Sequence, residues 1–133
     1  MNKVARKWLR QALHDLEMAQ KNIPIQGYDV AAFLSHQAVE KLLKAVYALR
    51  DRKVPKTHHI DELARGLGLQ DELIHVMMEL TIDYTFSRYP DVGDLIPFEA
   101  YDEKIATGKV KIAEQVFEAL AGEFQPLLGE DNG

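Results

Sequence analysis

The sequence has 133 residues, of which 47% are hydrophobic and 28% charged. This length and apolar content fit one globular domain, so we expect a single domain over residues 1–133 with a loose tail from about residue 128. No apolar run is long enough to cross a membrane, and the basic N-terminus reaches Asp15 before an apolar leader develops. We therefore expect a soluble, cytoplasmic protein. The absence of cysteine excludes disulfides and thiolate metal sites.

Charge is distributed unevenly along the chain. The net charge of −5 argues against a protein whose whole surface binds nucleic acid. Residues 1–65 carry 12 basic and 7 acidic side chains, whereas residues 66–133 carry 4 basic and 14 acidic ones. If the fold separates the two halves, one face is basic and suits a phosphate-bearing ligand or an acidic partner.

Apolar residues recur at steps of three and four along most of the chain, which predicts helices. The first helix is expected over residues 3–23, ended by Pro24 and Gly27. The second covers about 25 residues up to the basic cluster that starts at Arg50, and Pro55 confirms its end.

Three further helices are expected after Pro55. Thr57 is predicted to cap a short one, ended by the glycines at 66 and 68. The next begins near Asp71 and stops before Pro90. After a loop over residues 91–97, a last helix of about 25 residues includes Tyr101 and ends only near Pro126 and Gly129. No stretch alternates with period two, so we expect an all-α fold: an up-and-down bundle of four long helices plus one short helix.

Three segments, in this order, resemble the HEPN domain family (higher eukaryotes and prokaryotes nucleotide-binding). They are Phe33-Leu-Ser-His-Gln-Ala-Val-Glu-Lys-Leu-Leu-Lys-Ala, Pro55-Lys-Thr-His-His-Ile-Asp-Glu-Leu and Ser87-Arg-Tyr-Pro-Asp. Trp8, Ala12, Asp15-Leu16 and Tyr101 also match the family pattern, and the resemblance covers essentially the whole chain.

The resemblance implies a helical bundle, commonly dimeric, with a polar cleft for nucleotide or RNA. Small HEPN proteins of this kind are often encoded beside a minimal nucleotidyltransferase as a toxin–antitoxin or related module. Some members are metal-independent ribonucleases that carry an Arg followed, four to six residues later, by a His near the last long helix. This sequence departs from that pattern because no His follows Arg88.

Four polar residues at i, i+3, i+4 and i+7 form a stripe on the second helix: Gln37, Glu40, Lys41 and Lys44. One interpretation is a solvated face with an ordinary Glu40–Lys44 pair. The other is a face that points into a cleft or dimer interface, where the lysines bind phosphate and Gln37 or Glu40 a base or ribose.

The histidines could have either structural or functional roles. His36 falls near the edge of the buried face, which is typical of a hydrogen-bonded core histidine. His58 and His59 lie near Asp61 and Glu62, but adjacent histidines splay apart and the carboxylates suit the helix dipole, so we expect no metal site. Arg52 and His58 match the ribonuclease spacing only across the Pro55 loop.

Arg88 is the most suggestive single residue, because it is one of only 4 cations among residues 66–133 and stands between two aromatic residues before Pro90. It suits either a phosphate or a structural ion pair, for instance with Asp91 or Glu40.

Our leading hypothesis is a non-catalytic binding module without a cofactor. It binds a nucleotide or RNA, or docks a nucleotidyltransferase, and forms a homodimer. The expected ligand-binding residues are His36, Gln37, Glu40, Lys41, Lys44, His58, Arg88, Tyr89 and Asp91. The alternative is a divergent ribonuclease in which Arg88 stabilises the phosphate and His36 or His58 acts as acid or base. A structural dimer without a ligand is the third hypothesis.

Overall fold

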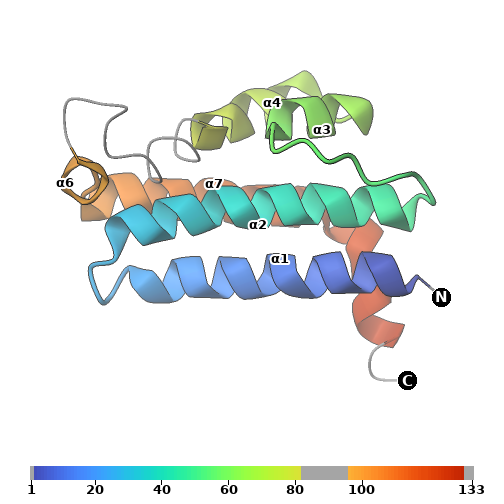
Figure 1. Cartoon of the computed structure of the whole chain (residues 1–133), viewed down its shortest axis with the longest axis horizontal. Coiled ribbons are helices and arrows are strands. Elements are labelled where there is room, and N and C mark those ends of the chain that lie inside the picture. Colours follow the sequence, from blue (N-terminus) through green and yellow to red (C-terminus); the bar gives the residue numbers. More distant parts are fainter. Residues whose placement is uncertain (1, 82–95, 131–133) are drawn as a thin grey trace.

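The computed structural model describes residues 2–81 and 96–130, which fold into helices with no strand among them. The long helices pack side by side, with the shorter helices above them and at one end (Figure 1). The long helices are α1 (Lys3–Asn22), α2 (Tyr28–Leu49) and α7 (Glu103–Glu130). The short elements are α3 (Ile60–Gly66), α4 (Asp71–Met77), the 3-10 helix η1 (Met78–Leu80) and α6 (Pro97–Ala100). The predicted all-α bundle is confirmed.

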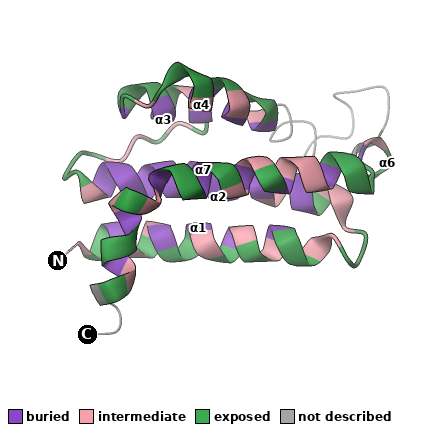
Figure 2. Cartoon of the chain, turned by 180° about the vertical axis from the view of Figure 1, so that it is seen from behind, coloured by how far each residue is buried: buried purple, intermediate pink, exposed green. Residues whose placement is uncertain are grey.

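Helix α2 is the central element of the bundle. Helix α1 runs antiparallel along one side of it, α7 packs along another, and α3 and α4 cover it from a third (Figures 1 and 2). As a result, 14 of its 22 residues are buried. Its Leu42, Leu43 and Val46 belong to the main hydrophobic core, together with Leu9 of α1 and Phe117 of α7.

The ends of the first two helices lie where the sequence predicts them. Helix α1 ends at Asn22, one residue before the predicted end, and α2 ends at Leu49. Asn2 caps α1, because its Oδ1 accepts a hydrogen bond from the Ala5 amide at 3.0 Å. Its side-chain amide also donates a hydrogen bond to the Ala48 carbonyl, and this bond connects the start of α1 to the end of α2.

The start of α3 differs from the prediction. Thr57 does not cap the helix, which begins at Ile60 with His59 in the N-cap position. Instead, the Thr57 hydroxyl oxygen accepts from the His59 amide and pairs with Glu62, both at 3.1 Å, and so shapes the turn before the helix. Helix α4 begins at Asp71 as predicted. It ends at Met77, where the 3-10 helix η1 follows, rather than continuing as a long α-helix through these residues. The rest of its expected course toward Pro90, and the loop after it up to residue 95, fall outside the described residues.

The last helix departs from the prediction at its start. Tyr101 is not part of it, because extended backbone at this residue separates α6 from α7. At the other end, α7 continues through Pro126 to Glu130, and its final turns bend away from the bundle axis (Figure 1). A proline tilts a helix because it lacks the amide that would bond to the fourth residue before it. Residues 128–130 are the last residues of α7.

None of the helices in residues 2–81 and 96–130 is long and apolar enough to cross a membrane.

Candidate functional site

A buried polar stripe runs along the central helix. His36, Glu40 and Lys44 follow each other at intervals of four residues, so they lie on one face of α2. Their exposed fractions are only 1%, 1% and 5%. Ionisable side chains are almost never this deeply buried unless they are paired, so the interactions of these three residues define the site.

Glu40 is the centre of this stripe. Its Oε2 atom lies 3.1 Å from Lys44 Nζ and 3.0 Å from His58 Nδ1. Burial raises the pKa of the Glu40 carboxyl, but the hydrogen bonds from His58 and Lys44 outweigh it, and the net pKa is lowered. The carboxylate is therefore ionised at neutral pH. Its other oxygen, Oε1, is buried and accepts no hydrogen bond from the described residues.

His36 is the neutral member of the stripe. Its Nδ1 lies 4.0 Å from Glu40 Oε1, which is beyond hydrogen-bond distance. Burial lowers the pKa of His36 to about 4, although the negative charge of Glu40 opposes this shift. His36 is thus a buried residue of α2, and its imidazole is uncharged at neutral pH.

His58 reaches Glu40 because the chain turns back sharply after α2. The amides of Asp51 and Arg52 bond to the carbonyls of Ala48 and Tyr47 at 3.1 and 2.9 Å, and Asp51 has a positive φ of 56°. This is a Schellman motif, here with aspartate in place of the usual glycine. Residues 52–59 then run back along α2 (Figure 1).

The orientation of the His58 ring follows from its partner. An ionised carboxylate only accepts hydrogen bonds, so Nδ1 of His58 carries the proton that it donates to Glu40. The side chain remains 57% exposed. His58 is thus a surface imidazole whose orientation is fixed by a buried carboxylate, the arrangement that prepares a histidine to bind a ligand or to transfer a proton.

Lys44 contacts Trp8 as well as Glu40. Its Nζ lies 5.4 Å from the centroid of the indole ring, within the range of a cation–π contact. The predicted Glu40–Lys44 pair therefore exists, but it is buried rather than solvated. From the sequence, Trp8 is identified only as a match to the family pattern, and nothing in the sequence indicates which side chain lies above its ring.

Gln37 and Lys41 lie beside the buried stripe, toward the surface. Both are half-buried, and Lys41 Nζ donates to Gln37 Oε1 at 2.7 Å. The predicted four-residue stripe is thus divided into a buried pair and a surface pair. Arg88, Tyr89 and Asp91 fall outside the described residues, so their relation to the stripe stays a prediction.

Arg52 and His58, whose sequence spacing matches the ribonuclease pattern, do not come together in the structure to form a site. Arg52 lies over the Tyr47 ring, with Cζ 4.7 Å from its centroid, and donates to the Gly66 carbonyl at 2.7 Å. His58 instead contacts Glu40, which precedes Tyr47 on α2 by about 10 Å along the helix axis. The two side chains are therefore anchored at separate points.

The carboxylates near the two histidines are engaged locally. Asp61 accepts from Arg65 at 2.8 Å, and Glu62 pairs with Thr57. In the described part of the chain, no group of three or more His, Asp or Glu side chains converges on a point suited to a metal ion.

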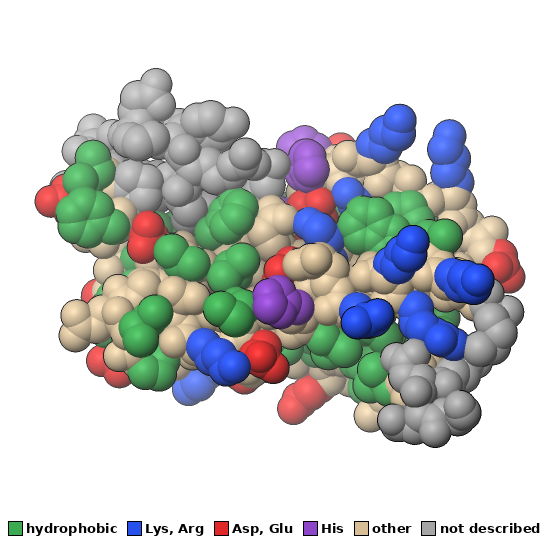
Figure 3. Space-filling view, turned by 60° about the horizontal axis from the view of Figure 1, so that its bottom comes forward, with side chains coloured by type: hydrophobic (Ala, Val, Ile, Leu, Met, Phe, Trp, Pro, Cys, Tyr) green, Lys and Arg blue, Asp and Glu red, His purple; other side chains and the backbone are tan. Residues whose placement is uncertain are grey.

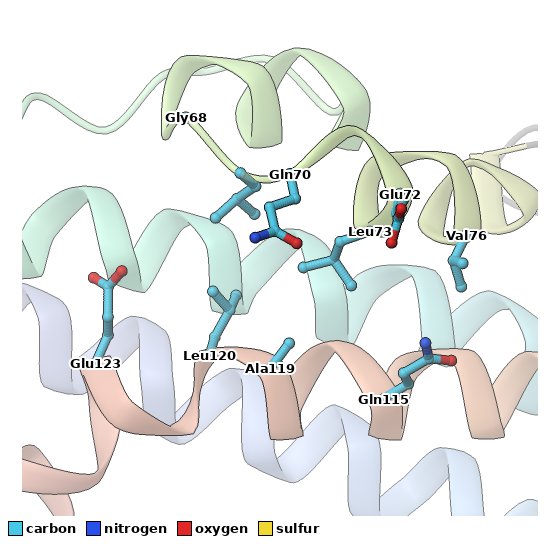
Figure 4. A pocket seen from close by; sticks show the side chains of 10 residues that line it. Gly68, Gln70, Glu72, Leu73, Val76, Gln115, Ala119, Leu120 and Glu123 are labelled. Atoms are coloured by element: carbon cyan, nitrogen blue, oxygen red, sulfur yellow. The ribbon is translucent and has the colours of Figure 1, made fainter.

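A separate pocket of about 560 Å³ lies between the α3–α4 region and α7. Figure 4 shows Leu73 and Val76 on one side of it and Gln115 and Leu120 on the other. None of the described residues predicted to bind ligand lines this pocket. The sequence offers no signal for it, because its lining alternates between ordinary core and surface residues of distant segments.

Comparison with known proteins identifies the family. The model of the HEPN domain matches residues 5–123, which is most of the chain. The chain belongs to the HEPN domain family. A crystal structure of TT1696 from Thermus thermophilus is similar to this HEPN chain with a TM-score of 0.83 and 28% identity, covering 92% of this chain and 99% of that one. The crystal structure of ST0689, described as an archaeal HEPN homologue, has a TM-score of 0.75 and 30% identity, covering 90% and 97%. No curated protein matches the sequence.

Proposed function

We propose that this HEPN protein is a non-catalytic module that binds a nucleotide or another phosphate-bearing ligand beside the buried Glu40. The observation that carries the proposal is the Glu40–His58–Lys44 cluster, in which two cationic or donor groups are held by one carboxylate. Charged groups inside a small domain cost several kcal/mol each in desolvation and add little net stability when paired. Perturbed ionisable groups of this kind are characteristic of functional sites.

The surroundings of the cluster suit a nucleotide. Lys41 lies next to it at the surface and supplies a positive charge for phosphate. Gln37, His58 and Glu40 supply donors and acceptors for a base or ribose. The proposed site also includes Arg88, Tyr89 and Asp91, which are assigned to it from the sequence. Arg88 would be a second phosphate ligand.

We also propose that the protein works with partners. Membership of the HEPN family supports a two-component module with a minimal nucleotidyltransferase, of the toxin–antitoxin type. A homodimer is supported by the surface of α2 before Lys41, where Val30 is 42% exposed and Phe33 and Leu34 are half-buried. Pairing this flank with a two-fold copy would bury apolar area that the monomer leaves at the surface.

The second candidate is a divergent ribonuclease, and the oriented imidazole of His58 favours it. Arg88 would stabilise the phosphate and His58 would move the proton. His36 is a poor second catalyst, because it is neutral at pH 7 and only 1% exposed. Purified protein incubated with RNA and a chelator is therefore expected to show no cleavage. Cleavage that is lost in both Arg88→Ala and His58→Ala, and kept in the exposed-histidine control His75→Ala, would favour the ribonuclease instead.

The single tryptophan provides a direct test of ligand binding. Because Lys44 lies against Trp8, a phosphate that draws on Lys44 should change the indole emission. We expect ATP to produce a saturable change in the wild type and in His75→Ala, and a weaker affinity by about tenfold in His58→Ala, as for one lost charge-assisted hydrogen bond. Equal affinities of all three proteins, or no response to ATP, would contradict the proposed site.

A further inference from the structure

A concentration of positive charge lies at the end of the bundle where α1 begins and α2 ends. Because the two helices are antiparallel, the segment of residues 2–14 begins beside the end of α2, as the contacts of Asn2 with Ala48 and of Trp8 with Lys44 show, and the segment of residues 41–56 contains that end of α2 and the chain that follows it. These two segments contain ten Lys and Arg residues and one acidic residue, Asp51, in a chain of net charge −5. We call this surface the basic end. Figure 3 shows a gathering of Lys and Arg side chains on the right of the molecule.

Most of these cations form no ion pair with a carboxylate of residues 2–81 and 96–130. The nearby acidic side chains of Asp15 and Glu40 are buried, and Glu40 is paired with Lys44 and His58. Glu123 of α7 pairs with Arg50. Six exposed cations of the basic end make no ion pair with a carboxylate of the described residues: Lys3, Lys7, Arg10, Arg52, Lys53 and Lys56.

The spacing of these cations suits a repeating anion. Lys3, Lys7 and Arg10 follow one side of α1 at steps of four and three residues, or about 6 and 4.5 Å along the axis. The cations at positions 52–56 lie on the backbone that runs beside the end of α2. A single phosphate needs two or three converging donors, whereas cations spread along two segments match a chain with a charge at every unit.

The chemistry of the surface favours nucleic acid over an acidic protein. Protein interfaces have an apolar core and few lysines. Of the large hydrophobic side chains that are exposed in residues 2–81 and 96–130, only Val4 belongs to the basic end. The four exposed lysines and two arginines therefore resemble a sequence-independent phosphate-binding surface.

We propose that the basic end binds the phosphate backbone of single-stranded nucleic acid without reading its bases. This site goes beyond the nucleotide site near Glu40, because it uses other residues and stands even if that site binds no nucleotide.

Fluorescence anisotropy with a labelled oligouridylate of about a dozen nucleotides tests the proposal. The test variant replaces Lys3, Lys7 and Arg10 with Gln, and the matched control replaces the exposed Lys21, Lys104 and Lys111 with Gln, so that both lose three positive charges. We expect the test variant to bind at least tenfold more weakly at low salt. Its plot of log affinity against log salt should be shallower by about 2, since each phosphate contact contributes roughly 0.7. The control should bind within about twofold of the wild type.

Each alternative has its own outcome. An equal loss of affinity in both triple variants would show that binding depends only on net charge and would contradict the proposed site. Failure of the wild-type protein to bind the oligonucleotide at low salt would also contradict it. Polyglutamate that competes as well as RNA would indicate an acidic protein as the partner. An oligothymidylate should bind like the RNA, and a strong preference for RNA would contradict pure backbone binding. The test variant should keep its Trp8 response to ATP, so failure of one site is distinguishable from failure of the other.

Discussion

His58 and Glu40 are 18 positions apart in the sequence, and Nδ1 of the histidine lies 3.0 Å from Oε2 of the carboxylate. The contact joins the segment before α3 to the middle of α2. Glu40 is 1% exposed and His58 is 57% exposed, so the pair connects the interior of the bundle to its surface. Both the stability of the bundle and its binding of ligands should therefore respond to changes at this pair.

Removing the charge of Glu40 should destabilise the protein. In Glu40→Gln, Lys44 remains buried without a counter-charge, and loss of one partner of a buried pair costs about 3 kcal/mol. The neighbouring change Lys41→Gln removes only a half-buried contact with Gln37 and should shift the free energy of unfolding by about 0.5 kcal/mol or less. Urea denaturation measures both values. A similar small effect of the two substitutions would show that Glu40 is not the centre of the cluster.

Stability should fall at acidic pH because of His36. Its pKa is about 4 in the folded protein and 6.5 in the unfolded chain, so the unfolded state binds more protons between these values. The contribution of His36 is therefore fully present above about pH 6.5 and is lost as pH falls through 4, by up to about 3 kcal/mol. The lowered pKa of Glu40 acts in the same direction at the acidic end.

Unfolding free energies at pH 7.5 and 5 measure this effect. His36→Gln should remove most of the decrease over that interval, whereas His75→Ala, on an exposed helix surface, should keep it. An unchanged pH dependence in His36→Gln would assign the decrease to other groups.

Two glycines offer a matched test of how α3 is held on α2. A Cβ at Gly66 would lie 2.0 Å from the Tyr47 hydroxyl oxygen, whereas a Cβ at Gly122 in α7 would meet nothing within 4 Å. The Tyr47 hydroxyl donates to the Leu63 carbonyl at 2.8 Å, and this bond fixes α3. Gly66→Ala should therefore destabilise the fold by about 1–3 kcal/mol, and Gly122→Ala should stabilise it by about 0.5–1 kcal/mol. Thermal unfolding that places both variants on the same side of the wild type would contradict this packing.

The protein is expected to self-associate through the exposed flank of α2. A moderate interface holds at tens of micromolar, so sedimentation equilibrium in that range should give a dimer. Val30→Asp should shift the equilibrium toward monomer, and Val4→Asp, at a valine that is 55% exposed near the start of α1, should not. A monomeric wild type, or equal effects of the two substitutions on the dimerisation equilibrium, would contradict the proposed interface.

The sequence predicts α1 and α2 well, because their apolar periodicity and their ends are local properties. The sequence wrongly predicts Thr57 as the N-cap of α3. The Thr57 hydroxyl instead accepts a hydrogen bond from the His59 amide and donates one to Glu62. The sequence prediction also includes Tyr101 in the last helix, although the backbone there is extended. At the other end, the helix continues through Pro126 because Phe124 and Leu127 pack in the core. Tertiary burial here outweighs a local helix breaker.

The candidate site was predicted as a set of residues but not as an arrangement. Helical spacing places Glu40 and Lys44 together, yet burial of the pair depends on Trp8 and on the return of residues 52–59, which no local pattern specifies. The Asp51 turn that makes this return has no glycine to signal it. The contact between His58 and Glu40 is therefore a consequence of tertiary structure alone.

The most direct test of the proposed ligand site is the nuclear magnetic resonance spectrum of the five histidine rings during a titration with ATP. Substitution of each histidine assigns its signals. The account predicts that the ring signals of His58 shift in a saturable manner, while those of His75, on the exposed surface of α4, stay in place. An unchanged His58 ring at saturating ATP, or equal shifts of all exposed histidines, would contradict a nucleotide site at the Glu40 cluster.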